Sequence, residues 1–247
     1  MKVDFQPEVS AVSPFHDGDG VAAGTLASTA HARVRAEILS GAIVPGSRLH
    51  IRELCARLSI GLSPMREALN RLSAQGLVVQ SDQRGFTAAP LDLADLADLT
   101  QARAAINAAA LRDALAHGDA AWEEALLLAH HRLIRTPRQD AADPAWEARH
   151  ATFHAALLAG CRSGRLRLYA EQLFAMANRY RIVSRAVDAG PRDVAAEHAA
   201  ILQAALTRDV DRATALLNEH VGRTEALVRD ALLDRSRQET QPPCSRT

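Results

Sequence analysis

The sequence predicts a mainly α-helical protein, in which a small N-terminal unit of three helices and a β-hairpin precedes an antiparallel, all-helical bundle. Ala and Leu supply most of the apolar residues and only 4% of the residues are aromatic, which favours helices packed through small and aliphatic side chains. The two stretches that we interpret as strands both lie between residues 77 and 88. Glycine, proline and aspartate punctuate the remaining sequence at the spacing of helix starts and stops.

The first elements follow a short irregular segment. Residues 1–24 mix Pro, Gly, Asp and Ser without periodicity, and we expect a flexible N-terminal extension there. A helical pattern begins near Thr29 and stops at Gly41. The second helix is short, Ile51–Leu58, and a tight turn over residues 59–62 follows it.

A third helix and a hairpin complete the N-terminal unit. Ser63 is a favourable N-cap for this helix, Pro64 suits its first position, and Gly76 ends it. Strands over residues 77–79 and 86–88 are then joined by a loop with a glycine at its tip. Three helices followed by such a hairpin are the layout of a winged helix-turn-helix.

Beyond Pro90 the chain has the pattern of helices throughout. We expect them at about 92–117, 120–135, 144–160, 164–188, 192–207 and 211–234, separated by Gly-Asp, Asp-Pro, Ser-Gly and Gly-Pro pairs. The expected organisation is an extension over 1–24, a winged helix-turn-helix over 25–90, a helical domain over 91–236 and a flexible tail over 237–247.

Charge is distributed unevenly along the chain, although the formal net charge is zero. Residues 25–90 carry +4, because eight arginines stand against four acidic residues, whereas residues 1–24 carry −3 and the remainder −1. A basic unit joined to a neutral one is suited to binding a polyanion.

Three features bear on the cellular compartment. No apolar run approaches the roughly 20 residues that a membrane span needs, and the N-terminus lacks the basic and apolar segments of a signal peptide. The three cysteines are scattered without a CxxC pair, which indicates a reducing compartment and no cysteine-based zinc site. We therefore expect a cytoplasmic protein without a membrane partner.

The candidate DNA-binding residues lie on the elements that touch DNA in a helix-turn-helix. Its second helix enters the major groove, and residues 63–66 form the first turn of that helix here. Ser63 can donate to a phosphate, and Arg66 can reach a phosphate or a guanine edge. Arg52 could contact the backbone, and Arg84-Gly85 at the hairpin tip could enter the minor groove. Each arginine alone could equally be a solvated charge, but their joint placement favours DNA contact.

Four of the ten histidines form a pattern. His150 and His154 are four residues apart, so both rings project from one helix face, and His198 and His220 lie on two later, consecutive helices. Imidazoles on neighbouring antiparallel helices can converge in a bundle core and form a metal site. An isolated pair of this kind is more often partly buried and structural, so both interpretations stay open from the residues alone.

The N-terminal unit resembles the winged-helix domain of the GntR family in the segment PGSRLHIRELCARLSIGLSPMREALNRLSAQGLVVQSDQRGFTAAPL. The usual form in that family is PGxxLxExxLAxxLGVSRTPVREALxxLxxxGLVxxxxxRGxxV. The resemblance implies DNA contacts by Arg52, Ser63, Arg66 and Gly85. Leu62 replaces the arginine that usually precedes the Thr/Ser-Pro pair, so the operator sequence of the family does not carry over.

The C-terminal part resembles the helical FCD effector domain, which defines the FadR branch of this family, in WEARHATFHAALLAGC and AEHAAILQAALTRDVDRATALLNEH. Many members hold a divalent metal through one Asp and three His, and His154, His198 and His220 match the three histidines. His150 occupies the position where Asp is common. The resemblance therefore implies a metal held by three or four imidazoles, a donor set that favours Zn²⁺ or Ni²⁺ over Mg²⁺ or Ca²⁺.

A finer resemblance concerns the effector. The details GLSPMREAL, RHATFHAALLAGC and LFAMANRYR are similar to the carbon-starvation-induced, CsiR-type regulators of this branch. That subgroup is associated with genes for glutarate and 4-aminobutyrate breakdown, so the resemblance implies a small dicarboxylate. Arg103 matches an arginine common at the start of the effector domain and could bind a carboxylate bidentately, or form a structural salt bridge. Asn107 stands where an acidic residue is often found.

These features together predict a ligand-responsive transcription factor and not an enzyme. We expect a repressor of a catabolic operon that binds pseudo-palindromic operator DNA as a homodimer, with a small carboxylate effector at or near the metal. A metal-dependent enzyme is an alternative, because three histidines on zinc leave an open position, but HExxH, an evident general base and a nucleophile elbow are absent from the sequence. A metal sensor would need only the same histidines.

Overall fold

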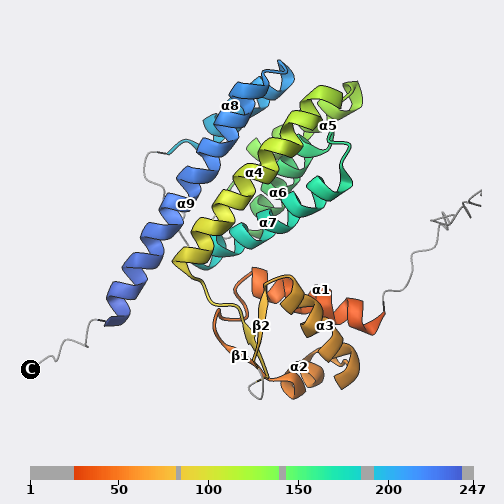
Figure 1. The fold of residues 1–247 in the computed structure, drawn as a ribbon, viewed down its shortest axis with the longest axis vertical. Coiled ribbons are helices and arrows are strands. Elements are labelled where there is room, and N and C mark those ends of the chain that lie inside the picture. Colours follow the sequence, from red (N-terminus) through yellow and green to blue (C-terminus); the bar gives the residue numbers. More distant parts are fainter. Residues whose placement is uncertain (1–24, 82–84, 139–142, 185–191, 241–247) are drawn as a thin grey trace, which may run out of the picture.

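A computed structural model describes residues 25–81, 85–138, 143–184 and 192–240 of the chain. Within these ranges the mainly α-helical fold predicted from the sequence is confirmed. A small unit with a three-stranded sheet lies at one end, and a bundle of long helices lies at the other (Figure 1). We call residues 25–90 the N-terminal unit and residues 93–240 the bundle.

The N-terminal unit contains three helices and three short strands: α1 (Leu26–Leu39), β1 (Arg48–Leu49), α2 (Ile51–Leu58), α3 (Leu62–Ala74), β2 (Val78–Ser81) and β3 (Gly85–Ala88). Its core is aliphatic and separate from that of the bundle, with Val34, Ile38, Met65 and Leu69 completely or almost completely buried. Because α1 and α3 both place an apolar face in this core, they pack against each other and present the other face of α3 outward.

The sheet contains one strand more than the sequence analysis expected. Both hairpin strands are present, and β3 also pairs antiparallel with β1, in the order β1-β3-β2. Strand β1 is two residues long, too short for an alternating pattern to be recognised. Leu49 lies opposite Phe86 and both are buried, so this pairing closes the core beneath the hairpin.

The start of α3 differs from the expectation. The N-cap is Gly61 and the helix begins at Leu62, so Ser63 lies inside the first turn and is not the cap. Pro64 is tolerated there because the first four amide groups of a helix have no partner within the helix, so an early proline does not mark the first position. Ser59, with φ of +54°, ends α2 and leaves room for this tight turn.

The bundle consists of α4 (Leu93–His117), α5 (Ala120–Ile134), α6 (Pro144–Leu158), α7 (Gly164–Ser184), α8 (Val194–Leu206) and α9 (Val210–Thr240). Four of these helices begin after an aspartate whose carboxylate accepts backbone N–H bonds: Asp92, Asp119, Asp143 and Asp193. These N-caps explain why the helix starts could be predicted from the sequence to within a few residues.

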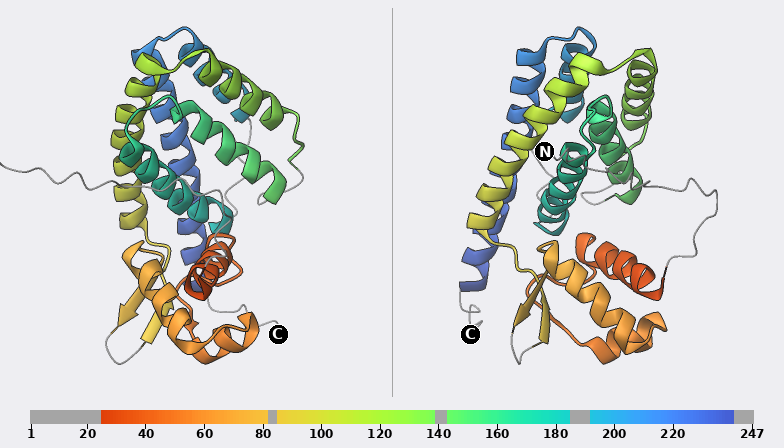
Figure 2. Two further views of the ribbon diagram at one scale, coloured as in Figure 1. Left: turned by 90° about the vertical axis from the view of Figure 1, so that its right-hand side faces the viewer. Right: turned by 45° about the vertical axis from the view of Figure 1, so that its right-hand side comes forward.

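Helix α9 is longer than expected. It continues to Thr240, so residues 237–240 are helical and do not belong to the tail predicted after residue 236. Residues 185–188, expected at the end of the fourth bundle helix, lie outside the described part of the chain, and α7 ends at Ser184. Helix α4 packs against both α7 and α9 along the bundle (Figure 2).

The two parts meet at α7. This helix contacts α1, and Met176 packs against the core of the N-terminal unit as well as against a small cluster around Leu96 and Tyr180. A cleft of about 490 Å³ lies between the parts and is lined by residues of α1, α3 and α7. None of the described helices is both long and apolar enough to span a bilayer.

Candidate metal centre and DNA-binding surface

Four histidines from three helices converge inside the bundle. His150 and His154 come from α6, His198 from α8 and His220 from α9, and all four side chains are buried. One ring nitrogen of each lies within 4.8 Å of the corresponding nitrogen of every other. The Nε2 atoms of His150 and His154, one helical turn apart, are separated by 3.0 Å. The convergence expected from the sequence is therefore present.

Burial keeps these imidazoles neutral. It is the largest cause of the lowered pKa of each of the four rings; the pKa of His198, with all causes together, is about 3. Repulsion between the rings as they protonate lowers the pKa values further. A neutral imidazole offers a free lone pair, which is the form that binds a metal ion.

The residues present fit a transition metal ion. The four candidate ligand nitrogens all lie within 4.8 Å of one another. The nitrogens around a tetrahedral Zn²⁺ with Zn–N bonds of about 2.0–2.1 Å would lie roughly 3.4 Å apart, so small side-chain shifts would bring these four to that spacing. Among the four clustered histidines, two buried ring nitrogens, Nδ1 of His150 and Nε2 of His198, have no hydrogen-bond partner in the described structure. A cavity of about 20 Å³, lined by three of these rings, is large enough for one ion or one water molecule.

Glu197 orients one of the rings. Its carboxylate accepts from Nδ1 of His220 at 2.8 Å and also binds Arg192 at 2.6 Å and Arg223 at 2.9 Å. Partial burial alone would raise the pKa of Glu197, but these hydrogen bonds outweigh it and lower the pKa well below its usual range. A carboxylate behind a histidine fixes the ring so that Nε2 faces the metal position. Glu197 is not among the residues that the sequence motifs indicate; its only signal there is its place directly before His198.

Arg103 on α4 borders the same space. It is 8% exposed, and it lines both the small cavity and a larger cavity of about 670 Å³ that also contains Asn107, His154 and Phe174. Within the described residues its guanidinium has no carboxylate partner, and its Nε has no hydrogen bond, so the salt bridge considered from the sequence is not seen there. Burial and the nearby Arg181 lower the pKa of Arg103 to about 10, which leaves it charged at neutral pH.

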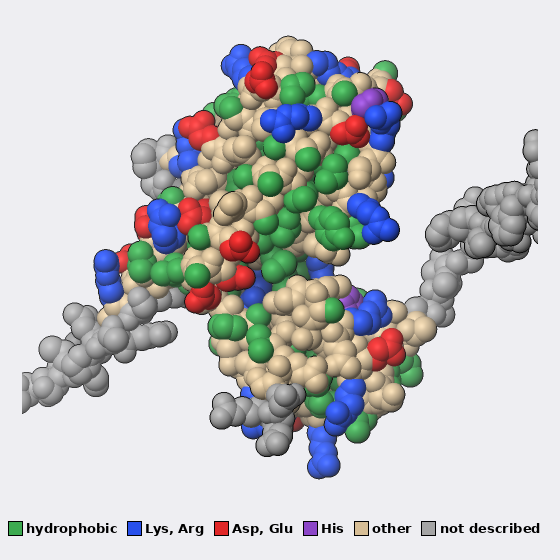
Figure 3. Space-filling view, viewed as in Figure 1, with side chains coloured by type: hydrophobic (Ala, Val, Ile, Leu, Met, Phe, Trp, Pro, Cys, Tyr) green, Lys and Arg blue, Asp and Glu red, His purple; other side chains and the backbone are tan. Residues whose placement is uncertain are grey.

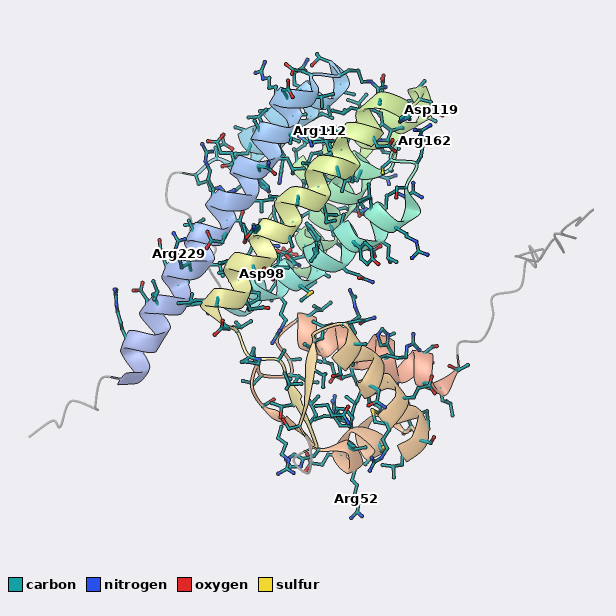
Figure 4. All side chains as sticks on the ribbon, viewed as in Figure 1. Arg52, Asp98, Arg112, Asp119, Arg162 and Arg229 are labelled. Atoms are coloured by element: carbon teal, nitrogen blue, oxygen red, sulfur yellow. The ribbon has the colours of Figure 1, made fainter. Side chains whose placement is uncertain are left out.

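The candidate DNA-binding residues lie at the end of the molecule far from the histidines. Arg52, in the first turn of α2, projects from the tip of the N-terminal unit (Figure 4), where arginine side chains extend outward (Figure 3). Ser63 and Arg66 are exposed in the first turns of α3, and Gly85, with φ of +82°, opens β3. Arg84 lies outside the described residues. The four described residues are therefore exposed on the N-terminal unit, and none of them forms an ion pair within the described part of the chain.

Comparison with protein families and known proteins agrees with both parts. Residues 26–87 match the model "Bacterial regulatory proteins, gntR family", and residues 98–223 match the model "FCD domain". An uncharacterized HTH-type transcriptional regulator, BphR of Paraburkholderia xenovorans, is 36% identical over 80% of this chain and 82% of its own length. The HTH-type transcriptional repressor GlaR of Escherichia coli K12 is 34% identical over 75% of this chain and 87% of its own.

Solved structures share the fold. Escherichia coli McbR/YncC superimposes with a TM-score of 0.71 and 18% identity, covering 85% of this chain and 99% of that one. A putative GntR regulator from Rhodococcus sp. RHA1 gives a TM-score of 0.68 with 23% identity, covering 84% and 99%. The matched families and the named relatives are transcriptional regulators, so the metal-dependent enzyme considered from the sequence is excluded. The chain belongs to the GntR family of bacterial regulators, in the branch that carries an FCD domain, and is a DNA-binding transcriptional regulator.

Proposed function

We propose that this chain is a metal-loaded repressor that releases operator DNA when a small carboxylate binds beside the histidine centre. The observation that carries the proposal is the buried, unpaired guanidinium of Arg103, which lines the same small cavity as three of the four imidazoles, those of His150, His154 and His220. A buried cation without a counter-ion is costly, so the site is suited to an anion that enters from outside.

We propose Zn²⁺ or Ni²⁺ as the resident metal, with His154, His198 and His220 as ligands and His150 as the fourth. When bound, the ion would supply positive charge and open coordination positions for a carboxylate oxygen. The chain's own residues do the rest: Glu197 holds His220, Arg103 receives a second carboxylate bidentately, and burial excludes competing water.

Elemental analysis of protein purified without a polyhistidine tag tests the metal. We expect about one transition metal ion per chain, and its loss in the variant His154→Ala/His198→Ala. The control is His131→Ala, which removes an exposed imidazole from α5. A metal-free wild-type protein that still responds to its ligand would contradict the proposal.

For the effector we propose a short dicarboxylate such as glutarate, in line with the resemblance to CsiR-type regulators. The cavity of about 670 Å³, whose lining includes both Arg103 and Arg167, leaves room for such a molecule. A thermal-shift screen of straight-chain dicarboxylates on metal-loaded protein tests this, since a ligand at about 100 times its Kd stabilises by about 2.7 kcal/mol. Arg103→Met should abolish the shift, and an unchanged shift would rule Arg103 out.

For DNA binding we propose that residues 25–90 form the DNA-binding domain and residues 91–236 the effector domain, on either side of Pro90. Arg52, Ser63, Arg66 and Gly85, with Arg84, would contact a pseudo-palindromic operator in a homodimer, the usual assembly of GntR regulators. GlaR is named a repressor, which supports repression here. The resemblance to CsiR-type regulators supports a catabolic operon as the target. A regulator of this kind acts on the chromosome, so we also propose a cytoplasmic location.

A metal sensor is a second candidate, favoured by the fact that the four imidazoles are already assembled without an organic ligand. Titration of metal-free protein with Zn²⁺, read as operator binding, separates the two. A sensor changes DNA affinity with Zn²⁺ alone, whereas the proposed regulator changes it only when a dicarboxylate is added.

A further inference from the structure

Three consecutive polar side chains at the C-terminal end of α7 are buried. Arg179, Tyr180 and Arg181 are only 3%, 1% and 7% exposed. Successive side chains of a helix point in different directions, so the three side chains of this short segment contact three different parts of the molecule. Buried polar side chains are usually hydrogen-bonded, and each of these three has at least one partner, which lies in a different part of the molecule.

Arg181 reaches the helix that carries two of the histidines. Its guanidinium donates to the carboxylate of Glu147 on α6, less than one turn before His150. It also lies 5.6 Å from the ring of Trp146, which stacks on His150 with the ring centroids 4.7 Å apart. Arg181 lines the small cavity as well. A displacement of α6 at the histidine centre would therefore move Arg181 directly.

Arg179 and Tyr180 hold the segment that joins the N-terminal unit to the bundle. Arg179 donates to the carbonyl oxygen of Ala89, directly after β3. The Tyr180 hydroxyl donates to the carboxylate of Asp95 at 2.5 Å and accepts from the backbone N–H of Asp92 at 3.2 Å. Burial and the bond to Asp95 raise the pKa of Tyr180, which keeps the hydroxyl protonated as a donor. Breaking these bonds would leave buried polar groups without partners, so the segment follows α7.

The remainder of α7 connects the same two places. Phe174 packs against His150 and His154, with ring centroids 5.6 and 5.2 Å apart, whereas Met176 packs into the core of the N-terminal unit. In both views of Figure 2 this helix lies directly above the N-terminal unit. A shift of α7 as a rigid element would therefore carry the N-terminal unit with it.

We propose that Arg179, Tyr180 and Arg181 are positioning residues that couple the state of the histidine centre to the placement of the DNA-binding unit. The proposal rests on the proposed function, because ligand binding at the centre is the natural perturbation. When α6 shifts, Arg181 moves with Glu147. Arg179 and Tyr180 then move too, and their hydrogen bonds displace Ala89 and Asp92. The signal thus passes from α6 through α7 to the linker.

Hydrogen exchange in a double-mutant cycle tests this coupling without any ligand. The perturbation is Glu147→Gln, and the readout is exchange of the Ala88 and Ala89 amides, which donate to Ser47 and Leu77 and not to Tyr180. We expect Glu147→Gln to speed this exchange by about fivefold or more, the lower end of typical coupling between two sites. In the Tyr180→Phe background the same change should have less than about half that effect.

The control is Tyr169→Phe, which removes an exposed hydroxyl on the same helix and should leave the Glu147→Gln effect intact. If Tyr180→Phe does not fold, Asp95→Asn weakens the same hydrogen bond. Equal effects of Glu147→Gln in both backgrounds, or no effect in the first, would overturn the coupling. Calorimetric titration with Zn²⁺ on the same samples judges the metal site separately, because absence of Zn²⁺ binding contradicts the proposed function and not the cycle.

Discussion

Two of the buried arginines around the histidine centre are each paired with a carboxylate, whereas a third, in the described part of the chain, is not. Arg181 is neutralised by Glu147, and Arg192 by Glu197, in ion pairs that are nearly or largely buried. Arg103, equally buried, has no such partner in the described part of the chain. Because desolvation of a lone cation costs free energy that folding does not recover, this position is better explained by ligand binding than by stability.

At this scale the DNA-binding surface makes a direct prediction. Arg66→Ala should weaken operator binding by about 1–3 kcal/mol, because it removes an arginine placed to reach a base or phosphate in the major groove. Fluorescence anisotropy with labelled operator measures the change. Arg112→Ala is the matched control, since Arg112 lies on the bundle, away from the N-terminal unit (Figure 4). Equal affinity of Arg66→Ala and wild type would mean that α3 does not enter the groove as proposed.

The buried imidazoles make a prediction about pH. Their pKa values are lower in the folded than in the unfolded chain, so unfolding takes up protons below the ordinary histidine pKa of about 6.5. Stability is fully present above that pH and is lost as the pH falls towards the folded values, about 3 for His198. The Tm of metal-free protein in chelator should therefore fall between pH 7 and pH 5, less steeply for His198→Asn. A Tm independent of pH in this range would show that the rings are not buried.

The histidine cluster could be predicted from the sequence, whereas its surroundings could not. His150 and His154 follow the helical repeat, which is a local signal. The partners of Glu147 and Tyr180 lie 34 and 85–88 residues away, and no local pattern indicates pairings over such distances. The same holds for Glu197, whose role depends on how α8 and α9 face each other.

At the scale of single elements, helices with clear caps were predicted well and short irregular pieces were not. An aspartate before a helical pattern satisfies free backbone N–H groups, so it marks the start of α4 and α5 reliably. Strand β1 has only two residues and is defined by its antiparallel pairing with β3, not by a pattern of its own. The start of α3 was misplaced because both Ser63 and Gly61 are acceptable caps, and the preceding turn decides between them.

The hairpin carries an element-scale prediction. Gly85 opens β3 with φ of +82°, and a Cβ there would meet nothing within 4 Å, so backbone strain alone opposes a side chain. Gly85→Ala should destabilise the protein by about 1–2 kcal/mol, as measured by urea unfolding. Gly222→Ala is the control, because Gly222 lies within α9, its φ is not positive and a new Cβ there would also meet nothing within 4 Å. Equal stability of the two variants would contradict the left-handed conformation of Gly85.

At the scale of the whole molecule, the histidine centre and the DNA-binding surface do not overlap. The centre lies within the bundle, and Arg52 projects from the opposite end of the N-terminal unit (Figures 1 and 4). A ligand at the centre cannot cover that surface, so any effect on DNA must pass through the relative placement of the two parts.

Thermodynamic linkage then makes a prediction about the complete regulator. If a dicarboxylate lowers operator affinity by about 5- to 150-fold, operator DNA must lower dicarboxylate affinity by the same factor. Calorimetric titration of metal-loaded protein with glutarate, with and without a saturating operator duplex, measures both directions. Glutarate that binds with one affinity in both conditions would rule out coupling between the sites.

The contact between Arg179 and Ala89 has a consequence for how new regulators arise. Arg179 donates a hydrogen bond to a main-chain oxygen, which any amino acid at position 89 would supply. The hydrogen-bond partners of Tyr180 are Asp92 and Asp95, on the bundle side of Pro90. A recombination event that joins a foreign winged helix just before residue 89 would preserve the hydrogen bonds of Arg179 and Tyr180. The packing of Met176 against the exchanged core and the contact between α1 and α7 would have to be matched. The same bundle can thus be combined with different winged-helix units. A chimaera built at that junction should have the ligand response of the protein that supplies the bundle.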